Sequence, residues 1–154
     1  MPRFLRLLAV AVPLILGACG SDNATAPEPP SIEGTTFAAS LGVDLAAMTK
    51  TASGLYLRDL TVGTDTAVAA AGRTVTVSYV GAFPDGTQFD DGAFSFPLGA
   101  GKVIAGFDEG VTGMRVGGKR QLVIPPALAY GSQGYRGIPP NAILVFTVEV
   151  AGVQ

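Results

Sequence analysis

Hydrophobic and polar residues alternate in several short segments of the chain, and this pattern predicts β-strands. In the clearest of them, Arg73–Phe83, the residues Val75, Val77 and Tyr79 occupy one face while Thr and Ser residues occupy the other. The following residues, Pro84–Thr87, have the composition of a hairpin turn. The same reasoning predicts strands at Gly54–Leu60, Gln88–Asp90, Phe94–Leu98, Lys119–Ile124 and Ile143–Val150.

One segment has a helical period instead. Its apolar residues recur every three or four positions, and two acidic residues lie near its start, where the helix dipole favours them. Three glycines lower its helix propensity, so packing against the rest of the protein must hold it together. Because strands outnumber helices, the expected class is α+β, with an antiparallel sheet packed on one short helix. The apolar positions are Ile104, Phe107, Val111 and Met114, and another short helix is expected around Leu45–Met48.

Residues 1–18 have the features of a signal peptide. Arg3 and Arg6 precede the apolar run Leu7–Leu16, which is too short to span a bilayer. The run continues into Leu16-Gly17-Ala18-Cys19, which resembles the lipobox of bacterial lipoproteins, where the cysteine is lipidated. This interpretation predicts anchoring to a membrane through acyl chains on Cys19. The alternative is an ordinary secretory leader in which the cysteine has no role.

The residue composition divides the chain after the predicted signal peptide into three parts. Residues 19–36 hold the lipidated cysteine and a polar, proline-rich segment that is expected to be a disordered tether. Residues 37–53 form an N-terminal extension, and residues 54–154 form the main domain. We therefore expect a protein of the cell envelope that faces the periplasm. Gly20 follows the cysteine where some bacteria place a retention signal, which by analogy is compatible with an outer-membrane address.

The composition excludes several kinds of chemistry. The chain has no histidine, one cysteine, 14% charged residues and a formal net charge of −2. A Cys/His metal site, a Ser-His-Asp triad and an internal disulfide are therefore impossible, and we expect no metal or cofactor. A mildly acidic chain without a basic stripe is not expected to bind nucleic acid. Any activity must use carboxylates, tyrosines, backbone dipoles or an apolar pocket.

Four motifs occur in one order along the predicted domain. They are VSYVG at 77–81, DGTQFD at 85–90, VIAGFDEG at 103–110, and the series AYG, GIPPN and LVF between 129 and 146. Together they resemble the FKBP family of peptidyl-prolyl cis-trans isomerases over about Leu55–Val150. The resemblance implies a strongly curved antiparallel sheet wrapped over one short helix. An apolar pocket between them would bind proline-containing polypeptides and, as in the family, macrolide inhibitors.

The resemblance also implies roles for single residues. The Ile104 backbone N–H and the Tyr130 hydroxyl would bind the peptide backbone. Asp90 would orient Tyr79 near the carbonyl group of the X-Pro peptide bond, the bond that such an isomerase rotates. The catalytic set is thus Tyr79, Asp90, Ile104 and Tyr130, and the substrate-binding set is Phe89, Phe94, Val103, Phe107, Ile138 and Phe146, with Phe107 and Phe146 cradling the proline ring. Taken without the family, most of these rings would be interpreted as core residues, and Phe96 is expected in the core.

The sequence departs from the family pattern around the predicted pocket. Phe107 replaces the usual tryptophan of the pocket floor, which is expected to weaken macrolide binding before catalysis. The segment between Asp90 and Phe94 is shorter than in well-known members, and the flap carries Tyr135 where some members have histidine.

Three other functions remain to be weighed, namely a proline-binding module without catalysis, a folding chaperone and an envelope scaffold. Chaperone relatives insert a whole domain into the flap, but only 15 residues separate Tyr130 from Phe146 here. A scaffold would explain the anchor but not the pocket motifs. We expect the domain to act as a monomer.

Overall fold

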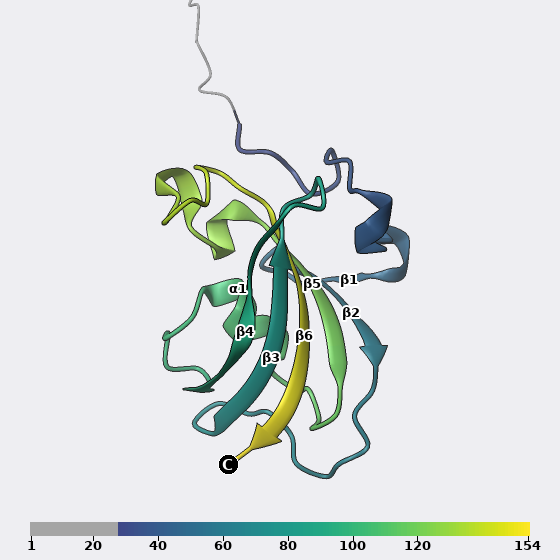
Figure 1. Ribbon diagram of the computed structural model, residues 1–154, viewed down its shortest axis with the longest axis vertical. Helices are drawn as coiled ribbons and strands as arrows, with labels where there is room; N and C mark the ends of the chain where they lie inside the picture. Colours follow the sequence, from purple (N-terminus) through teal and green to yellow (C-terminus); the bar gives the residue numbers. More distant parts are fainter. Residues whose placement is uncertain (1–27) are drawn as a thin grey trace, which may run out of the picture.

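A six-stranded antiparallel sheet forms the centre of the protein (Figure 1). The computed structural model describes residues 28–154, so the predicted signal peptide and Cys19 lie outside the described residues. The strand order is β1-β2-β5-β6-β3-β4. The strands are β1 (Thr49–Lys50), β2 (Tyr56–Thr61), β3 (Thr74–Ala82), β4 (Gln88–Pro97), β5 (Lys119–Ile124) and β6 (Leu144–Val153). The helices are α1 (Ala105–Val111) and the 3₁₀ turns Ala39–Leu41, Leu45–Ala47, Pro126–Leu128 and Gly131–Gln133.

The sheet is curved around α1, as Figure 1 shows. The pairing register shifts once in each of three strand pairs, between Asp59 and Thr61, between Thr76 and Val77, and between Gly81 and Ala82. Such irregularities bend a strand and increase its local twist. The predicted α+β class and the curved sheet over one short helix are confirmed. No helix among residues 28–154 has the length and apolar character needed to cross a bilayer.

Two glycines allow α1 to pack closely on β5. A Cβ atom at Gly106 would lie 2.4 Å from Cγ2 of Ile124, and one at Gly110 would lie 2.5 Å from Cδ1 of Leu122. The helix therefore gains a close contact with the sheet at the positions that lower its intrinsic propensity. It is shorter than the apolar period predicts, because Ile104 is its N-cap residue and Met114 follows its end.

Strand β4 differs from the sequence-based prediction. Two strands separated by a loop were expected at Gln88–Asp90 and Phe94–Leu98, but one continuous strand runs from Gln88 to Pro97. Asp91, Gly92 and Ala93 have low strand propensity, yet they pair with Val80, Tyr79 and Ser78 of β3. Hydrogen bonding to the long neighbouring strand thus overrides local preference.

The two faces of the sheet bury separate cores. The main core lies between the sheet and α1 and contains residues such as Val77, Phe96 and Val111. A second cluster lies on the opposite face, where neighbouring residues of the same strands point the other way. It contains the buried Ile32, Met48, Tyr56, Val123, Ile143 and Val145, with Phe37, Leu41, Val43 and Leu45 packed against them.

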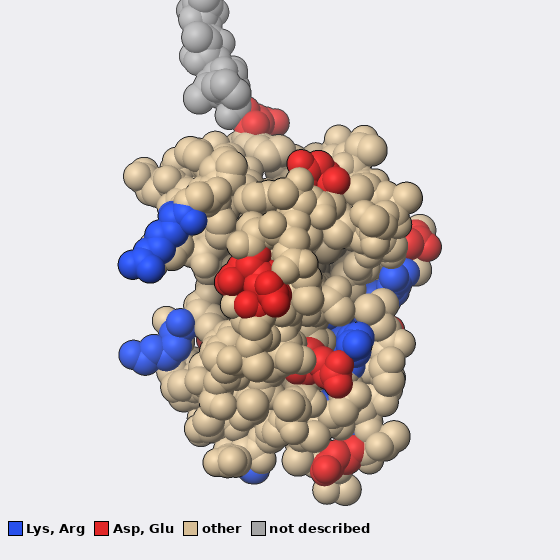
Figure 2. Space-filling model, in the orientation of Figure 1, with Lys and Arg blue, Asp and Glu red and all other residues tan. Residues whose placement is uncertain are grey.

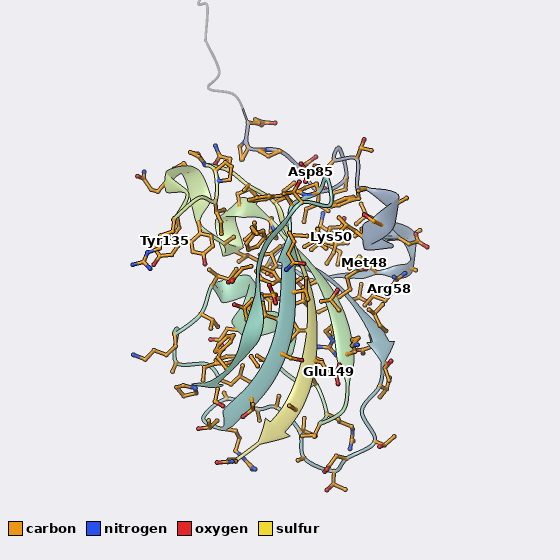
Figure 3. All side chains as sticks on the ribbon, in the orientation of Figure 1. Met48, Lys50, Arg58, Asp85, Tyr135 and Glu149 are labelled. Carbon is orange, nitrogen blue, oxygen red and sulfur yellow. The ribbon has the colours of Figure 1, made fainter. Side chains whose placement is uncertain are left out.

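This second cluster corrects the predicted extent of the tether. The disordered segment was expected to reach Thr36, but the Ile32 side chain is only 3% exposed. Glu33 accepts hydrogen bonds from the Lys50 ammonium and from the Tyr56 hydroxyl, the latter at 2.7 Å. The Arg58 guanidinium donates to the Gly42 carbonyl at 2.9 Å. Figure 3 shows Met48, Lys50 and Arg58 on the side of the molecule opposite Tyr135. We call the residues 31–45 the N-terminal strap.

Candidate functional site

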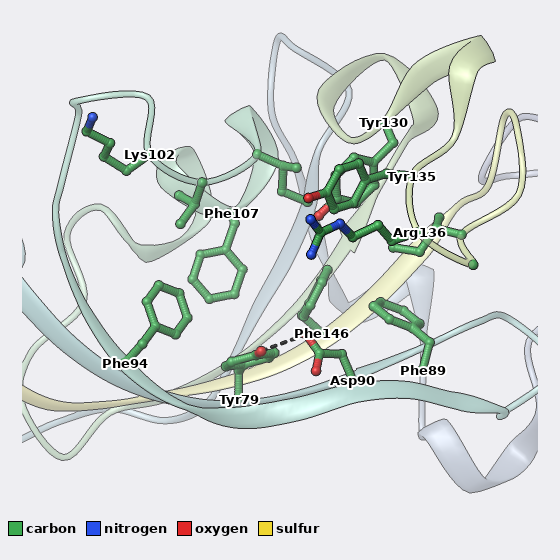
Figure 4. Close-up of a pocket in the computed structure, with 14 residues that line it drawn as sticks. Tyr79, Phe89, Asp90, Phe94, Lys102, Phe107, Tyr130, Tyr135, Arg136 and Phe146 are labelled. Carbon is green, nitrogen blue, oxygen red and sulfur yellow. Dashed lines mark hydrogen bonds between the residues drawn. The ribbon is translucent and has the colours of Figure 1, made fainter.

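A cavity of about 540 Å³ opens between the curved sheet, α1 and the loops that follow β4 and β5 (Figure 4). Its size lies within the range typical of small-ligand sites. Aromatic rings from β3, β4, α1 and β6 form its walls and floor. The lining residues are Tyr79, Phe89, Asp90, Phe94, Lys102, Val103, Ile104, Phe107, Tyr130, Tyr135, Arg136, Gly137, Ile138 and Phe146.

Phe107 and Phe146 form the floor of the cavity. Their side chains are only 4% and 6% exposed, so both belong to the main core as well as to the pocket. The two ring centroids are 5.4 Å apart in an edge-to-face arrangement, which is a favourable geometry for aromatic pairs. The Tyr79 ring lies 6.0 Å from Phe107 and 6.1 Å from Phe146. This contact network fixes the ring orientations in the absence of any ligand.

Gly81 makes room for two of these rings beside β3. A Cβ atom at this position would lie 2.7 Å from the Phe89 ring and 2.8 Å from the Phe146 ring. Such distances are too short for real atoms, so the rings could not lie where they do beside any other residue. Phe89 in turn contacts Phe146 edge to face, with centroids 5.6 Å apart. The glycine of the VSYVG motif therefore shapes one wall of the pocket.

Tyr79 and Asp90 form a hydrogen-bonded polar pair inside the pocket. The Tyr79 hydroxyl donates a hydrogen bond of 2.7 Å to the Asp90 carboxylate (dashed in Figure 4). Burial and this bond to a carboxylate raise the pKa of Tyr79 to about 12. The phenol is therefore neutral at any physiological pH, and its proton is directed at Asp90.

The flap between β5 and β6 supplies the opposite wall. Tyr130 and Tyr135 stack with their centroids 5.1 Å apart and an interplanar angle of 9°. Burial, and secondarily the neighbouring Tyr135 and Asp90, raise the pKa of Tyr130. Its hydroxyl has no hydrogen-bond partner among residues 28–154, and Figure 4 shows the ring at the cavity wall. A bound molecule could therefore use this hydroxyl as a donor.

The loop before α1 presents a free backbone donor. The Ile104 carbonyl accepts hydrogen bonds from the amides of Phe107 and Asp108, which begins the helix. The Ile104 amide itself pairs with no backbone carbonyl in the part of the chain that the structure describes. Because Ile104 lines the cavity, this N–H is a candidate donor for a carbonyl group bound there.

The structure brings together all ten pocket residues that the sequence predicts. Phe94 lines the cavity, whereas Phe96 is buried in the core, as expected. Cys19, the predicted lipidation site, lies outside the described residues. Sequence reasoning did not place Lys102, Arg136 and Gly137 in the pocket, and it named Tyr135 only as a flap residue that differs from some family members. For Lys102, Arg136 and Gly137 the signal in the sequence was their position in loops beside predicted site residues, because none of them belongs to a periodic pattern.

Comparison with known proteins identifies a family. The model for "FKBP-type peptidyl-prolyl cis-trans isomerase" matches residues 65–151. Among curated proteins, FK506-binding protein 2 of Yarrowia lipolytica is 50% identical over 92 residues, which are 56% of this chain and 64% of that protein. The FK506-binding protein of Streptomyces anulatus is 47% identical over 107 residues, which are 64% of this chain and 86% of that protein.

Solved structures agree with the sequence matches. FkpA from Escherichia coli is 40% identical with a TM-score of 0.64, and the match covers 70% of this chain and 52% of that one. An isomerase from Pseudomonas syringae pv. tomato is 34% identical with a TM-score of 0.65, over 75% of this chain and 86% of that one. The chain spans less than two thirds of several curated relatives, including 22% of FK506-binding protein 4 of Gibberella zeae.

Proposed function

Because the chain belongs to the family of FKBP-type peptidyl-prolyl cis-trans isomerases, we propose that it catalyses rotation of X-Pro peptide bonds in exported polypeptides. The observation that carries this proposal is the slot of preorganised aromatic rings with only a few directed polar groups. Bond rotation needs no nucleophile and no proton transfer, which agrees with a chain that lacks histidine.

The proposed mechanism follows from the origin of the barrier. Amide resonance opposes rotation by ~18–20 kcal/mol. A catalyst need only bind the twisted amide more tightly than either planar form. The twisted amide has less charge separation than the planar one, so an apolar slot favours it. Lowering the barrier by about 5–8 kcal/mol would accelerate rotation roughly 10⁴–10⁶-fold.

Each polar group has a proposed part in holding the twisted peptide. The proline ring would lie on Phe107 and Phe146, whose orientations are fixed by their neighbours. The free Ile104 amide would donate to the carbonyl on the C-terminal side of the proline, and the Tyr130 hydroxyl would donate to another backbone carbonyl. Asp90 would hold Tyr79 in place beside the rotating carbonyl.

The alternative function is a module that binds proline segments without catalysing their rotation. A protease-free assay, which follows the cis-to-trans relaxation of a proline peptide directly, separates the two. We expect the full-length chain to accelerate relaxation at substoichiometric concentration. Peptide binding without acceleration would favour the binding module. The strap should be retained in any shortened form, because Ile32 is part of the folded structure.

We further propose that the protein is a lipoprotein of the cell envelope. The support is the signal-peptide pattern of residues 1–18 and the single cysteine at position 19. Acyl chains on that cysteine would hold the domain at the periplasmic side of a membrane. Cys19→Ser should move the protein from the membrane fraction to the soluble fraction and abolish incorporation of labelled palmitate. Unchanged fractionation would refute the anchor without affecting the proposed activity.

FK506 is the expected competitor for the pocket, since several relatives are named FK506-binding proteins. Phe107 offers a smaller stacking surface than the tryptophan usual in the family, so we expect weaker inhibition. Phe107→Trp should tighten it.

A further inference from the structure

Two basic side chains stand at the mouth of the pocket, although the chain as a whole carries more acidic than basic residues, 12 against 10. Lys102 lies in the loop before α1, and Arg136 lies at the tip of the flap. Figure 4 shows them on opposite sides of the Phe107 ring. In Figure 2, two basic side chains protrude from the same edge of the molecule with a notch between them. The cationic groups thus come from separate loops that meet at the pocket.

Neither cation is neutralised by the protein within the described residues. The ion pairs found among residues 28–154 use Lys50, Lys119 and Arg120 instead. Among residues 28–154, Asp90 is the only carboxylate that lines the pocket, and it already accepts the Tyr79 hydrogen bond. The neighbouring Asp91 accepts a hydrogen bond from Gln88 at 2.7 Å. The two cations at the mouth are therefore available to a carboxylate from outside.

Arg136 is held in position by the flap. Its guanidinium lies 5.3 Å from the centroid of the Tyr135 ring, which stacks on Tyr130. Its backbone has a φ of 39°, in the left-handed region that residues other than glycine rarely adopt. Tyr135 and Ile138 exchange two backbone hydrogen bonds of 3.0 and 2.8 Å across this turn. A charge fixed by stacking and by a closed turn loses less freedom when it pairs with a ligand than a mobile one does.

From this arrangement we infer that the pocket prefers proline segments with a Glu or Asp residue next to the proline. The inference rests on the proposed isomerase function and specifies its substrate. A bound peptide would place its proline over Phe107, so the residues before and after it would pass the two cations. An ion pair of the peptide carboxylate with Lys102 or with Arg136 would form in contact with water. The preference for an acidic over a neutral residue should therefore be modest, about two- to fivefold in kcat/KM, and should fade as salt screens the charges.

Four matched peptides test this inference, with Glu or Gln placed either directly before or directly after the same proline. Rates from the protease-free assay give a Glu/Gln ratio of kcat/KM for each position, so differences in overall activity cancel. We expect a ratio above one at low salt for at least one position, and a ratio near one at high salt. Lys102→Gln and Arg136→Gln should each lower the ratio, and the double variant should bring it to one or below.

Arg73→Gln is the matched control, because Arg73 is exposed, does not line the pocket and loses the same charge. This variant should keep the Glu/Gln ratio of the wild-type chain. A wild-type ratio at or below one at both positions would overturn the inference, as would equal loss of the ratio in the Arg73 control. Failure to isomerise even the Gln peptides would instead refute the proposed function, so the two outcomes are distinguishable.

Discussion

The Tyr79 hydroxyl on β3 and the Asp90 carboxylate on the neighbouring strand β4 are joined by a hydrogen bond of 2.7 Å inside the pocket. Asp90 is paired in the ladder with Gly81, whose missing side chain leaves space for the Phe89 and Phe146 rings. One short stretch of two strands therefore fixes both the polar pair and the aromatic wall. This stretch is where substitutions should have the most specific effects.

The first prediction concerns ionisation of Tyr79. Because its pKa is raised to about 12 by burial and by Asp90, the phenol stays protonated when ordinary tyrosines titrate. Its favourable interaction is fully present below about pH 10 and is lost as the pH rises through the folded-state value. In an ultraviolet absorbance titration, the ionisation step of Tyr79 should lie near pH 12. Asp90→Asn should shift this step to lower pH and reduce kcat/KM. Tyr79→Phe should remove that step, and an unchanged titration in Asp90→Asn would contradict the proposed coupling.

The second prediction tests the role of Gly81. Gly81→Ala places a Cβ within 3 Å of two rings, which forces them or β3 to move. We expect the free energy of unfolding to fall by roughly 1–3 kcal/mol and isomerase activity to fall with it. Gly152→Ala is the control, since a Cβ there would meet Thr76 only at an ordinary 3.9 Å. Urea unfolding of both variants gives the comparison, and equal stability of the two would rule out the steric argument.

The third prediction separates the pocket floor from the flap. Phe107 belongs to both core and pocket, so Phe107→Leu should lower stability by about 1–3 kcal/mol and kcat/KM by roughly tenfold or more. Tyr130→Phe removes only a hydroxyl without a partner in the described part of the chain, so its melting temperature should stay close to that of the wild-type chain. Its kcat/KM should fall by about fivefold, the worth of one hydrogen bond. Full activity in Tyr130→Phe would remove the proposed contact with the peptide.

The fourth prediction concerns the N-terminal strap at acid pH. Hydrogen bonds from Lys50 and Tyr56 lower the pKa of Glu33 from 4.5 to about 2. Since the folded value is depressed, the stabilisation is present above pH 4.5 and is lost as the pH falls toward 2. Glu33→Gln should therefore lower stability at neutral pH and flatten its dependence on pH in this window. Chemical unfolding at a series of pH values provides the measurement, and parallel curves for the two proteins would contradict this role.

The residue pattern predicts the fold class, and the family resemblance of the motifs predicts most of the pocket. Alternation at Val75, Val77 and Tyr79 defines a face of β3, and that face does point to the core and the pocket. The order of the four motifs identified the family, and with it ten residues that the structure brings to one cavity. The strand pattern is encoded locally, in residue spacing, whereas the pocket roles came from the family resemblance of the motifs, since the rings taken alone would be interpreted as core residues.

Other features depend on contacts between distant segments, which local pattern does not record. Ile32 is a single apolar residue in a polar stretch. It is buried because it packs on the sheet face that carries Tyr56 and Val123, a contact that the local sequence does not record. Asp91 and Gly92 join a strand because β3 offers them hydrogen-bond partners. Lys102 and Arg136 are ordinary loop cations in the sequence, and both line the pocket only because the fold brings the two loops to its mouth. Side-chain periodicity specifies which face of an element is apolar, but the packing of whole elements decides what that face, and every exposed charge, will meet.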